Sequence, residues 1–265
     1  MTAGLDTPAQ PHLLDPAVVR IRTRGLTLGF GPTTVLGDID LDFEQGTITA
    51  LLGPTGSGKT TFLRTLNRMN DDVEGFWHRG EVLFDGRSIW DQHPMLLRRR
   101  VGMLFQRPNP FPMSILDNVA AGLRAHKVTD RRGAREAAEQ ALRQVGLWDA
   151  VSRRLGDSPF RLSGGQQQLL CLARALAVGP NVLLLDEPTS SLDPVSTESI
   201  EHLVRELATR LTVVVVTHNL AQARRLADRT AFFFQGRLVE AGHTEQVLEH
   251  PREQRTAHYV SGRFG

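Results

Sequence analysis

The feature that most limits the possible folds is an eight-residue loop at residues 53–60. It reads Gly-Pro-Thr-Gly-Ser-Gly-Lys-Thr and fits the pattern G-x-x-x-x-G-K-[ST]. An apolar, strand-like run, Ile48–Leu52, leads into the loop, and a helical pattern, Thr61–Met69, leads out of it. This order predicts a phosphate-binding loop, in which glycines turn backbone N–H groups towards the phosphates of a nucleotide at a helix N-terminus.

The side chains of this loop have separate expected roles. Lys59 supplies a compact positive charge for the phosphates, and the hydroxyl of Thr60 is suited to bind Mg²⁺. Lys59 and Lys127 are the only lysines among 31 basic residues, so at position 59 the chain departs from its usual arginine. A compact ammonium fits a tightly wrapped loop better than a planar guanidinium does. The expected ATP-binding residues here are Gly53, Pro54, Thr55, Gly56, Ser57, Gly58, Lys59, Thr60 and Thr61.

A second motif consists of two acids after an apolar strand. Val182–Leu185 reads as a buried strand and is followed by Asp186 and Glu187. The carboxyl end of such a strand opens into the ligand crevice of a parallel sheet. Asp186 is suited to hold Mg²⁺, and Glu187 is suited to polarise the attacking water as a general base. In isolation, such a pair could equally be two acids on a solvated turn.

Strand-like and helical patterns alternate along the chain and predict an α/β fold. Helical segments without a convincing strand fill about residues 107–178, which indicates a helical insertion opened by a proline-rich stretch. Residues 1–16 read as a flexible tail, and 17–265 as a single domain. The expected strands are Val18–Leu28, Val35–Phe43, Ile48–Leu52, Val82–Phe84, Val101–Phe105, Val182–Leu185, Thr212–Thr217, Ala231–Phe234 and Leu238–Glu240; helices in the insertion are expected at Ile115–Leu123, Asp130–Val145 and Gln166–Val178.

A third motif, Leu-Ser-Gly-Gly-Gln at residues 162–166, precedes the last of these helices. Ser163 and Gln166 have the spacing of a capping box, while Gly164 and Gly165 leave the first N–H groups of the helix bare. The helix end is therefore a second anion site. Because one chain already has a phosphate loop for its own nucleotide, this second site makes sense if it faces a nucleotide held by another copy.

With these three motifs the sequence resembles the ABC ATPase family from about residue 18 to its end. The resemblance implies a P-loop NTPase core with an antiparallel β subdomain and an inserted helical subdomain. It also implies that Phe30 stacks on adenine and that Gln106 contacts Mg²⁺ or the attacking water. Asp193, in the run 191–193, would cross a dimer interface near the nucleotide, and His218 would hold the γ-phosphate.

Within this family the sequence is similar to the ATPase subunits of bacterial phosphate importers. The run Gln106–Ile115 and the ending Tyr259–Gly265 carry this similarity. Leu169 stands where these subunits usually have arginine, and Phe30 lacks the hydroxyl of a tyrosine. Phosphate as the cargo follows from the resemblance alone, and an importer for another anion or small solute is the alternative.

Composition limits the remaining classes. No apolar run approaches the roughly 20 residues that span a bilayer. The net charge of +2 does not call for nucleic acid, and a single cysteine, Cys171, excludes an internal disulfide and a cysteine-rich zinc site. A soluble ABC ATPase acting on nucleic acid is therefore a weaker alternative. A soluble phosphotransferase would have no reason to carry residues 162–166.

The resemblance also implies partners and a location. We expect a homodimer of ATPase subunits that binds Mg²⁺ and ATP and drives two transmembrane permease subunits. An extracytoplasmic phosphate-binding protein would act through the permease, and nucleic acid is not expected as a partner. The chain would then be a peripheral protein on the cytoplasmic face of the cell membrane.

Overall fold

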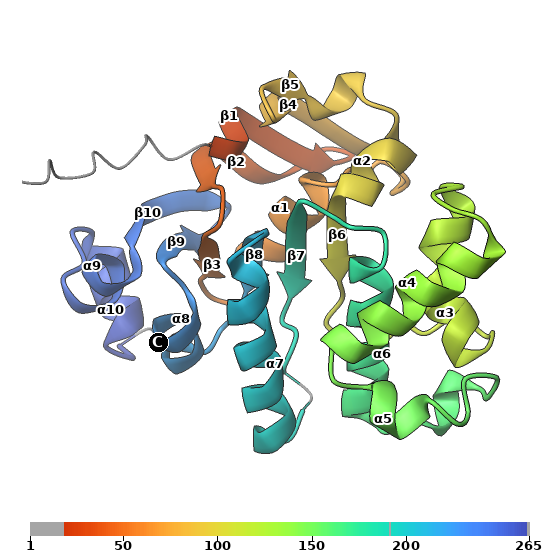
Figure 1. The fold of residues 1–265 in the computed structure, drawn as a ribbon. Coiled ribbons are helices and arrows are strands. Elements are labelled where there is room, and N and C mark those ends of the chain that lie inside the picture. Colours follow the sequence, from red (N-terminus) through yellow and green to blue (C-terminus); the bar gives the residue numbers. More distant parts are fainter. Residues whose placement is uncertain (1–18, 191, 264–265) are drawn as a thin grey trace, which may run out of the picture.

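A computed structural model describes residues 19–190 and 192–263 of the chain (Figure 1). The predicted tail at 1–16 lies outside the described residues, as do Ser191 and the last two residues of the C-terminal run. The strands form two sheets. The first has the order β2 (Thr33–Glu44), β1 (Val19–Phe30), β4 (Phe76–Phe84), β5 (Arg87–Ser88); the second has the order β10 (Arg237–His243), β9 (Arg229–Phe234), β3 (Ile48–Leu52), β8 (Thr212–Val216), β7 (Val182–Asp186), β6 (Val101–Leu104).

The six-stranded sheet is parallel except for its edge strand β10, which pairs antiparallel with β9. Its strands β3, β7 and β8 are buried along their whole length, which explains why they read as continuous apolar runs in the sequence. Successive side chains point to opposite faces, so Leu183 and Leu185 of β7 join one hydrophobic core, and Val182 and Leu184 join the other.

The antiparallel sheet covers one face of the parallel sheet (Figure 1). Helix α1 (Lys59–Thr65) contributes Phe62 and Leu63 to the smaller core, where they pack with residues of β1, β2 and β4. Helix α2 (Pro94–Arg100), preceded by the 3-10 turn η1 (Ile89–Asp91), contributes the buried Leu97 to the same core.

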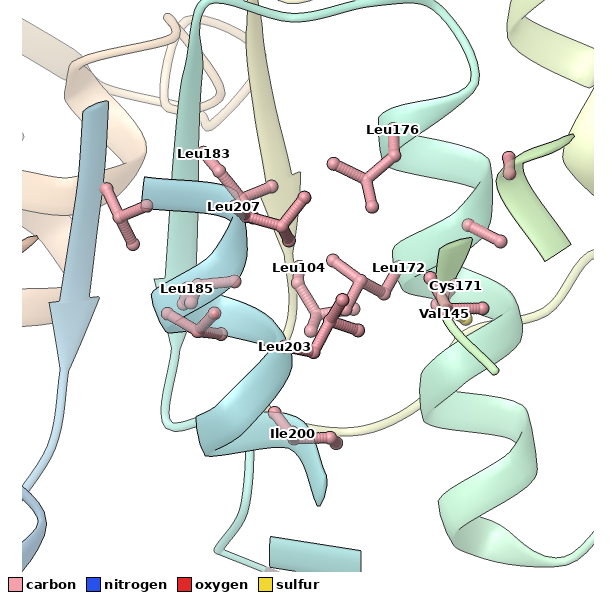
Figure 2. Packing of buried hydrophobic residues seen from close by; sticks show 14 of the residues in the cluster. Leu104, Val145, Cys171, Leu172, Leu176, Leu183, Leu185, Ile200, Leu203 and Leu207 are labelled. Carbon is pink, nitrogen blue, oxygen red and sulfur yellow. The ribbon is translucent and has the colours of Figure 1, made fainter. Parts of the chain in front are cut away.

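Four helices and a 3-10 turn lie between β6 and β7, and the described residues of this stretch contain no strand. They are α3 (Ile115–Ala125), α4 (Arg131–Gln144), α5 (Trp148–Val151), η2 (Pro159–Arg161) and α6 (Gly164–Leu176). Side chains of α6 gather with those of β6, β7 and α7 (Pro194–Ala208) in the larger core (Figure 2). Cys171 is buried in this core, and Leu169 packs against it, which gives this apolar residue a structural role.

Helix α8 (Leu220–Leu226) precedes β9, and the chain closes with α9 (Thr244–Glu249) and α10 (Gln254–Val260) beside the β10 edge (Figure 1). None of the helices within the described residues combines the length and the apolar character needed to span a lipid bilayer.

The helix expected at Thr61–Met69 is shorter in the structure, and the prediction of its end was wrong. Helix α1 ends at Thr65, and Arg68 adopts a left-handed conformation with φ 62°. The N–H of Met69 bonds to the carbonyl of Arg64, and that of Arg68 bonds to Thr65, which is the hydrogen-bond pattern of a helix C-terminus. The Nδ2 of Asn70 also donates to the Thr61 carbonyl, so a side chain beyond the helix end is bonded back to the helix.

Candidate active site

The phosphate loop joins β3 to α1, as the sequence predicted, and three of its glycines have backbone angles that other residues rarely adopt. Gly53, Gly56 and Gly58 have φ values of 143°, 81° and 95°. A Cβ atom at Gly53 would lie 2.0 Å from the carbonyl oxygen of Phe233, and one at Gly58 would lie 2.5 Å from Leu36. The loop therefore depends on glycine for space as well as for conformation.

Lys59 is the buried cation of this loop, with 6% of its surface exposed. Its Nζ donates to the carbonyl oxygens of Gly53 and Pro54, both at 2.8 Å. Burial lowers the pKa of Lys59, while the carboxylates of Glu187 and Asp186 act the other way. Among the described residues it forms no ion pair within 4.0 Å, so the loop holds a buried ammonium suited to an anionic ligand.

Asp186 lies at the end of β7, opposite the start of α1. The hydroxyl of Thr60 donates to its Oδ1 at 2.8 Å, and the guanidinium of Arg64 lies 3.6 Å from its Oδ2. Burial raises the pKa of the Asp186 carboxyl, although the Thr60 hydrogen bond and the Arg64 charge act in the opposite direction. Two hard oxygen donors, a hydroxyl and a carboxylate, thus face one another, which is a donor set that suits Mg²⁺.

Glu187 is the next residue and has φ 45°, a left-handed conformation that is uncommon for a residue other than glycine. Its backbone N–H donates to Val216 of β8 at 3.0 Å. Its Oε2 accepts a hydrogen bond from Nε2 of Gln106 at 2.9 Å and lies 3.4 Å from Nδ1 of His218. The structure therefore brings together the three residues that the sequence analysis assigned to hydrolysis.

One open cavity of about 450 Å³ is lined by Lys59 and Thr60 of the loop together with Gln106, Glu187 and His218. It also includes Val35 of β2, which the sequence analysis did not select because a valine in a strand carries no signal of its own. Phe30, Ser163–Gln166 and Asp193 do not line it. Phe30 ends β1 and packs against Phe76, with 5.6 Å between ring centroids. The lining residues are Val35, Thr55, Gly56, Gly58, Lys59, Thr60, Thr61, Gln106, Glu187 and His218.

The Leu-Ser-Gly-Gly-Gln motif begins helix α6, and the predicted capping box is confirmed. Ser163 Oγ accepts from the N–H of Gln166, whose side chain accepts from the N–H of Ser163. The helix starts at Gly164 and ends at Leu176, slightly before the range expected from the sequence. A Cβ at Gly164 would meet no atom within 4 Å, whereas one at Gly165 would lie 3.0 Å from Ser196 Oγ.

Asp193 has a local structural role in this chain. Its carboxylate accepts hydrogen bonds from the N–H groups of Val195 and Ser196, and it caps helix α7, which Pro194 opens.

A buried polar network around Gln222 joins the segment that follows Glu187 to the segment that leads into His218. Its amide donates to Thr189 at 2.8 Å and to Glu201 at 3.1 Å, and its oxygen accepts from Thr217 at 2.7 Å. Arg225 completes the network with two hydrogen bonds to Glu201. The sequence gives no signal for this network, because its residues come from three separate segments and belong to no motif.

Gln168 of α6 is a second missed residue. It is buried, and its amide donates to the carbonyls of Phe105 at 3.0 Å and Pro188 at 3.2 Å, next to Gln106 and Glu187. The run of three glutamines at 166–168 was a visible signal, but the sequence alone does not show which of them faces inwards.

Comparison with known proteins decides the family. The sequence profile of the ABC transporter family matches residues 36–190, more than half of the chain. The chain belongs to the ABC transporter family. The resemblance and the α/β fold with a P-loop core that it implied are thereby confirmed, and this ABC chain binds ATP.

Curated relatives of this ABC protein are similar over most of its length. It is 67% identical over 242 residues to a phosphate import ATP-binding protein, PstB, of Mycobacterium intracellulare, which covers 91% of this chain and 85% of the relative. It is 62% identical over 253 residues to the phosphate import ATP-binding protein PstB 2 of Mycobacterium tuberculosis, covering 95% and 92%.

Two solved ABC structures share the fold. CbiO1 from Clostridium perfringens, part of the ABC transporter complex cbiONQ, has a TM-score of 0.75 and 26% identity, covering 92% of this chain and 96% of that one. A bacterial Atm1-family ABC exporter with ATP bound has a TM-score of 0.78 and 25% identity, covering 98% of this chain. The present chain spans only 44% of the exporter chain.

Proposed function

We propose that this chain is the ATP-binding and ATP-hydrolysing subunit of an importer for inorganic phosphate. The observation that carries the ATPase assignment is the convergence, in one cavity, of buried Lys59, Glu187 and Thr60, whose hydroxyl is hydrogen-bonded to Asp186. The support for phosphate is the name that relatives with 62% and 67% identity carry. An importer of another anion or small solute would share the same cavity, so the cargo needs its own test.

ATP binding in this proposal uses the loop as it stands. The N–H groups of residues 53–61 and the ammonium of Lys59 would hold the phosphates at the start of α1. Lys59 would exchange its bonds to the Gly53 and Pro54 carbonyls for bonds to phosphate oxygens. Phe30, at the end of β1 and backed by Phe76, would stack on adenine.

Hydrolysis would be assisted by Mg²⁺, which supplies charge neutralisation for the phosphates when bound. Thr60 and Asp186 would hold it, with Gln106 as a further contact. Among the described residues, no group of three or more His, Cys, Asp or Glu side chains could hold a metal ion by itself, and nucleotide oxygens and water would complete the ligand set. Glu187 would accept a proton from the attacking water, and His218 would hold the γ-phosphate.

A second copy of the chain would complete the site. Ser163, Gly164, Gly165 and Gln166 do not line the cavity of their own chain, and an N–H-rich helix end facing outwards is suited to a phosphate of another copy. Asp193 would lie at the same interface. We therefore propose a homodimer that binds ATP between its subunits.

The membrane partners would dock beside the helical region at about 107–178. Phe111 and Met113 are each 41% exposed, and the segment that carries them follows Gln106 directly. Arg174 of α6 holds this segment by hydrogen bonds to Asn109 and lies 4.2 Å from the ring of Phe111. We propose that two transmembrane permease subunits contact this surface, and that an extracytoplasmic phosphate-binding protein acts through them.

This assembly would place the chain on the cytoplasmic face of the cell membrane as a peripheral protein. Nucleic acid has no part in the proposal, because the net charge of the chain is only +2.

The test is phosphate uptake by a strain that lacks this subunit. Uptake of labelled phosphate at low external concentration should be lost, the wild-type chain should restore it, and Lys59→Ala should not, because a complex that cannot bind ATP cannot cycle. Lys127→Ala is the matched control, since it removes the only other lysine, which is exposed and does not line the cavity. Sulfate and molybdate uptake are measured in parallel. Normal phosphate uptake with loss of another anion would reject phosphate as the cargo.

A further inference from the structure

Glu187 and His218 border two cavities. One is the cavity beside the phosphate loop, and the other, of about 880 Å³, is lined mainly by residues between 189 and 205 and by residues of α8. The side chain of Glu187 is 22% exposed and that of His218 is 63% exposed. Side chains that border open space have few packing contacts to hold them. Their positions therefore depend on hydrogen bonds in the segments that carry them.

Gln222 of α8 holds both chain neighbours of His218. It is 4% exposed, and its Oε1 accepts a hydrogen bond from the hydroxyl of Thr217 at 2.7 Å. Its backbone N–H donates to Oδ1 of Asn219 at 3.0 Å, and the N–H of Asn219 donates to the Thr217 hydroxyl at 3.0 Å. The residues before and after His218 are thus closed with Gln222 into one hydrogen-bonded ring.

The same side chain also reaches the segment that follows Glu187. The Nε2 of Gln222 donates to the hydroxyl of Thr189 at 2.8 Å. The N–H of Ser190 and that of Glu187 bond in turn to the backbone, the first to the carbonyl of Glu187 and the second to Val216 of β8. One amide group therefore connects the segment after Glu187 to the segment that carries His218.

A buried carboxylate fixes the orientation of this amide. Glu201 of α7 is 6% exposed, and its Oε1 accepts from Nε2 of Gln222 at 3.1 Å. Burial acts to raise the pKa of Glu201, but hydrogen bonds from Arg225 and Gln222 lower it below its usual value, so the group is ionised. An ionised carboxylate only accepts hydrogen bonds. The amide nitrogen must therefore face Glu201, which leaves the amide oxygen to accept from Thr217.

We propose that Gln222 is a positioning residue for ATP hydrolysis, which holds the segment after Glu187 and the two neighbours of His218 in one arrangement. This inference rests on the proposed ATPase function. Gln222 does not line the cavity beside the phosphate loop, so its role is to place other groups. The Oε2 of Glu187 lies 3.4 Å from Nδ1 of His218, and a displacement of about 1 Å at a reacting site can cost about a hundredfold in rate.

Gln222→Met tests the proposal, because it keeps an unbranched side chain and removes the hydrogen bonds of the amide. Steady-state ATP hydrolysis is measured on the chain purified with its membrane partners, and thermal unfolding on the isolated chain. We expect kcat to fall about tenfold or more, because Glu187 and His218 lose their fixed arrangement. The KM for ATP should stay within about twofold of the wild type, because the loop at 53–60 is unchanged.

Thr230→Val is the matched control. It removes a buried hydrogen bond, from Thr230 of β9 to Thr244 at 3.0 Å, and neither residue lines either cavity. The variant should lower the unfolding temperature, since the Thr244 hydroxyl loses its partner, and should leave kcat near the wild-type value. An equal fall of kcat in Thr230→Val would overturn the inference, because the effect would then be a general loss of stability.

Thr189→Val breaks only the bond from Gln222 to the segment after Glu187. We expect it to lower kcat about threefold or more with KM unchanged, and to cause no further loss when added to Gln222→Met, because both changes remove the same connection. If Gln222→Met does not fold, Thr189→Val alone carries the test. A wild-type kcat in either folded variant, or losses that multiply in the double variant, would overturn the inference. Absence of ATP hydrolysis by the wild-type complex would instead reject the proposed function, so the two failures are distinguishable.

Discussion

Glu187 combines an unfavourable backbone with a central position in the cavity. A left-handed residue other than glycine costs on the order of 1 kcal/mol or more, and such residues persist where the surroundings hold them. The bond from its N–H to Val216 and the contacts of its carboxylate with Gln106 and His218 provide this support. We infer that the strained backbone aims the carboxylate at the cavity beside the phosphate loop.

Glu187→Gln tests the role of this carboxylate. The amide keeps the size of the side chain but cannot accept a proton from water, so ATP turnover should fall by about a hundredfold or more. ATP affinity should stay near the wild-type value, because Lys59 and the loop glycines are unchanged. Single-turnover hydrolysis and nucleotide titration measure the two quantities. Glu245→Gln, at an exposed position on α9, is the control, and near-normal turnover in Glu187→Gln would remove Glu187 from the mechanism.

The sequence predicts the residues of the site well where chemistry requires them to be consecutive. The loop at 53–60 and the pair Asp186–Glu187 are continuous motifs; residues of the loop and Glu187 line one cavity, and Asp186 accepts a hydrogen bond from Thr60 of the loop. Gln222 could not be assigned in this way. Its hydrogen bond to Thr189 joins residues 33 positions apart, and only the packing of strands and helices brings them together.

At the scale of elements, the sequence predicts the inner strands of the parallel sheet because burial on both faces leaves a continuous apolar run. Helix ends are less predictable, because they depend on local hydrogen bonds. Helix α1 ends at Thr65, shortly before the left-handed Arg68, and helical periodicity does not show this end. The start of α6 is better specified, since Ser163 and Gln166 cap each other within four residues.

Gly164→Asp tests the start of α6 as a site for the nucleotide of another copy. A side chain at Gly164 meets no atom of its own chain within 4 Å, and an acid in the first turn of a helix is favourable, so the monomer should remain stable. The new charge would repel a phosphate that docks there, which should cost about a hundredfold in hydrolysis. Gly165 is a poorer choice, because Ser196 already crowds it.

The measurements for this variant are unfolding temperature, ATP affinity of the single chain and rate of hydrolysis. We expect the first two to match the wild type and the third to fall. Gly156→Asp is the control, since a side chain at Gly156 also meets nothing within 4 Å. A lower affinity of the isolated chain for ATP would contradict the assignment of Gly164 to the second copy's nucleotide.

At the scale of the molecule, the parallel sheet separates two hydrophobic cores and carries the proposed catalytic residues just beyond the ends of its strands. The smaller core holds the antiparallel sheet and α1, and the larger core holds the helical region and α7. The cavity beside the phosphate loop is open, and no residue from the start of α6 lines it. A single chain therefore has a site for ATP but lacks a cover for it, and a second copy would provide one.

Nucleotide should therefore control the oligomeric state. Glu187→Gln with Mg²⁺ and ATP should elute from size-exclusion chromatography at twice the chain mass of 29.4 kDa, because in the proposed homodimer ATP would be held between the subunits without being hydrolysed. Without nucleotide it should elute as a single chain. Adding Lys59→Ala should abolish the dimer by preventing binding, and adding Gly164→Asp should abolish it by repelling the phosphate, whereas adding Lys127→Ala should change nothing. A dimer that forms equally without ATP, or that survives Gly164→Asp, would show that the two copies meet through another surface.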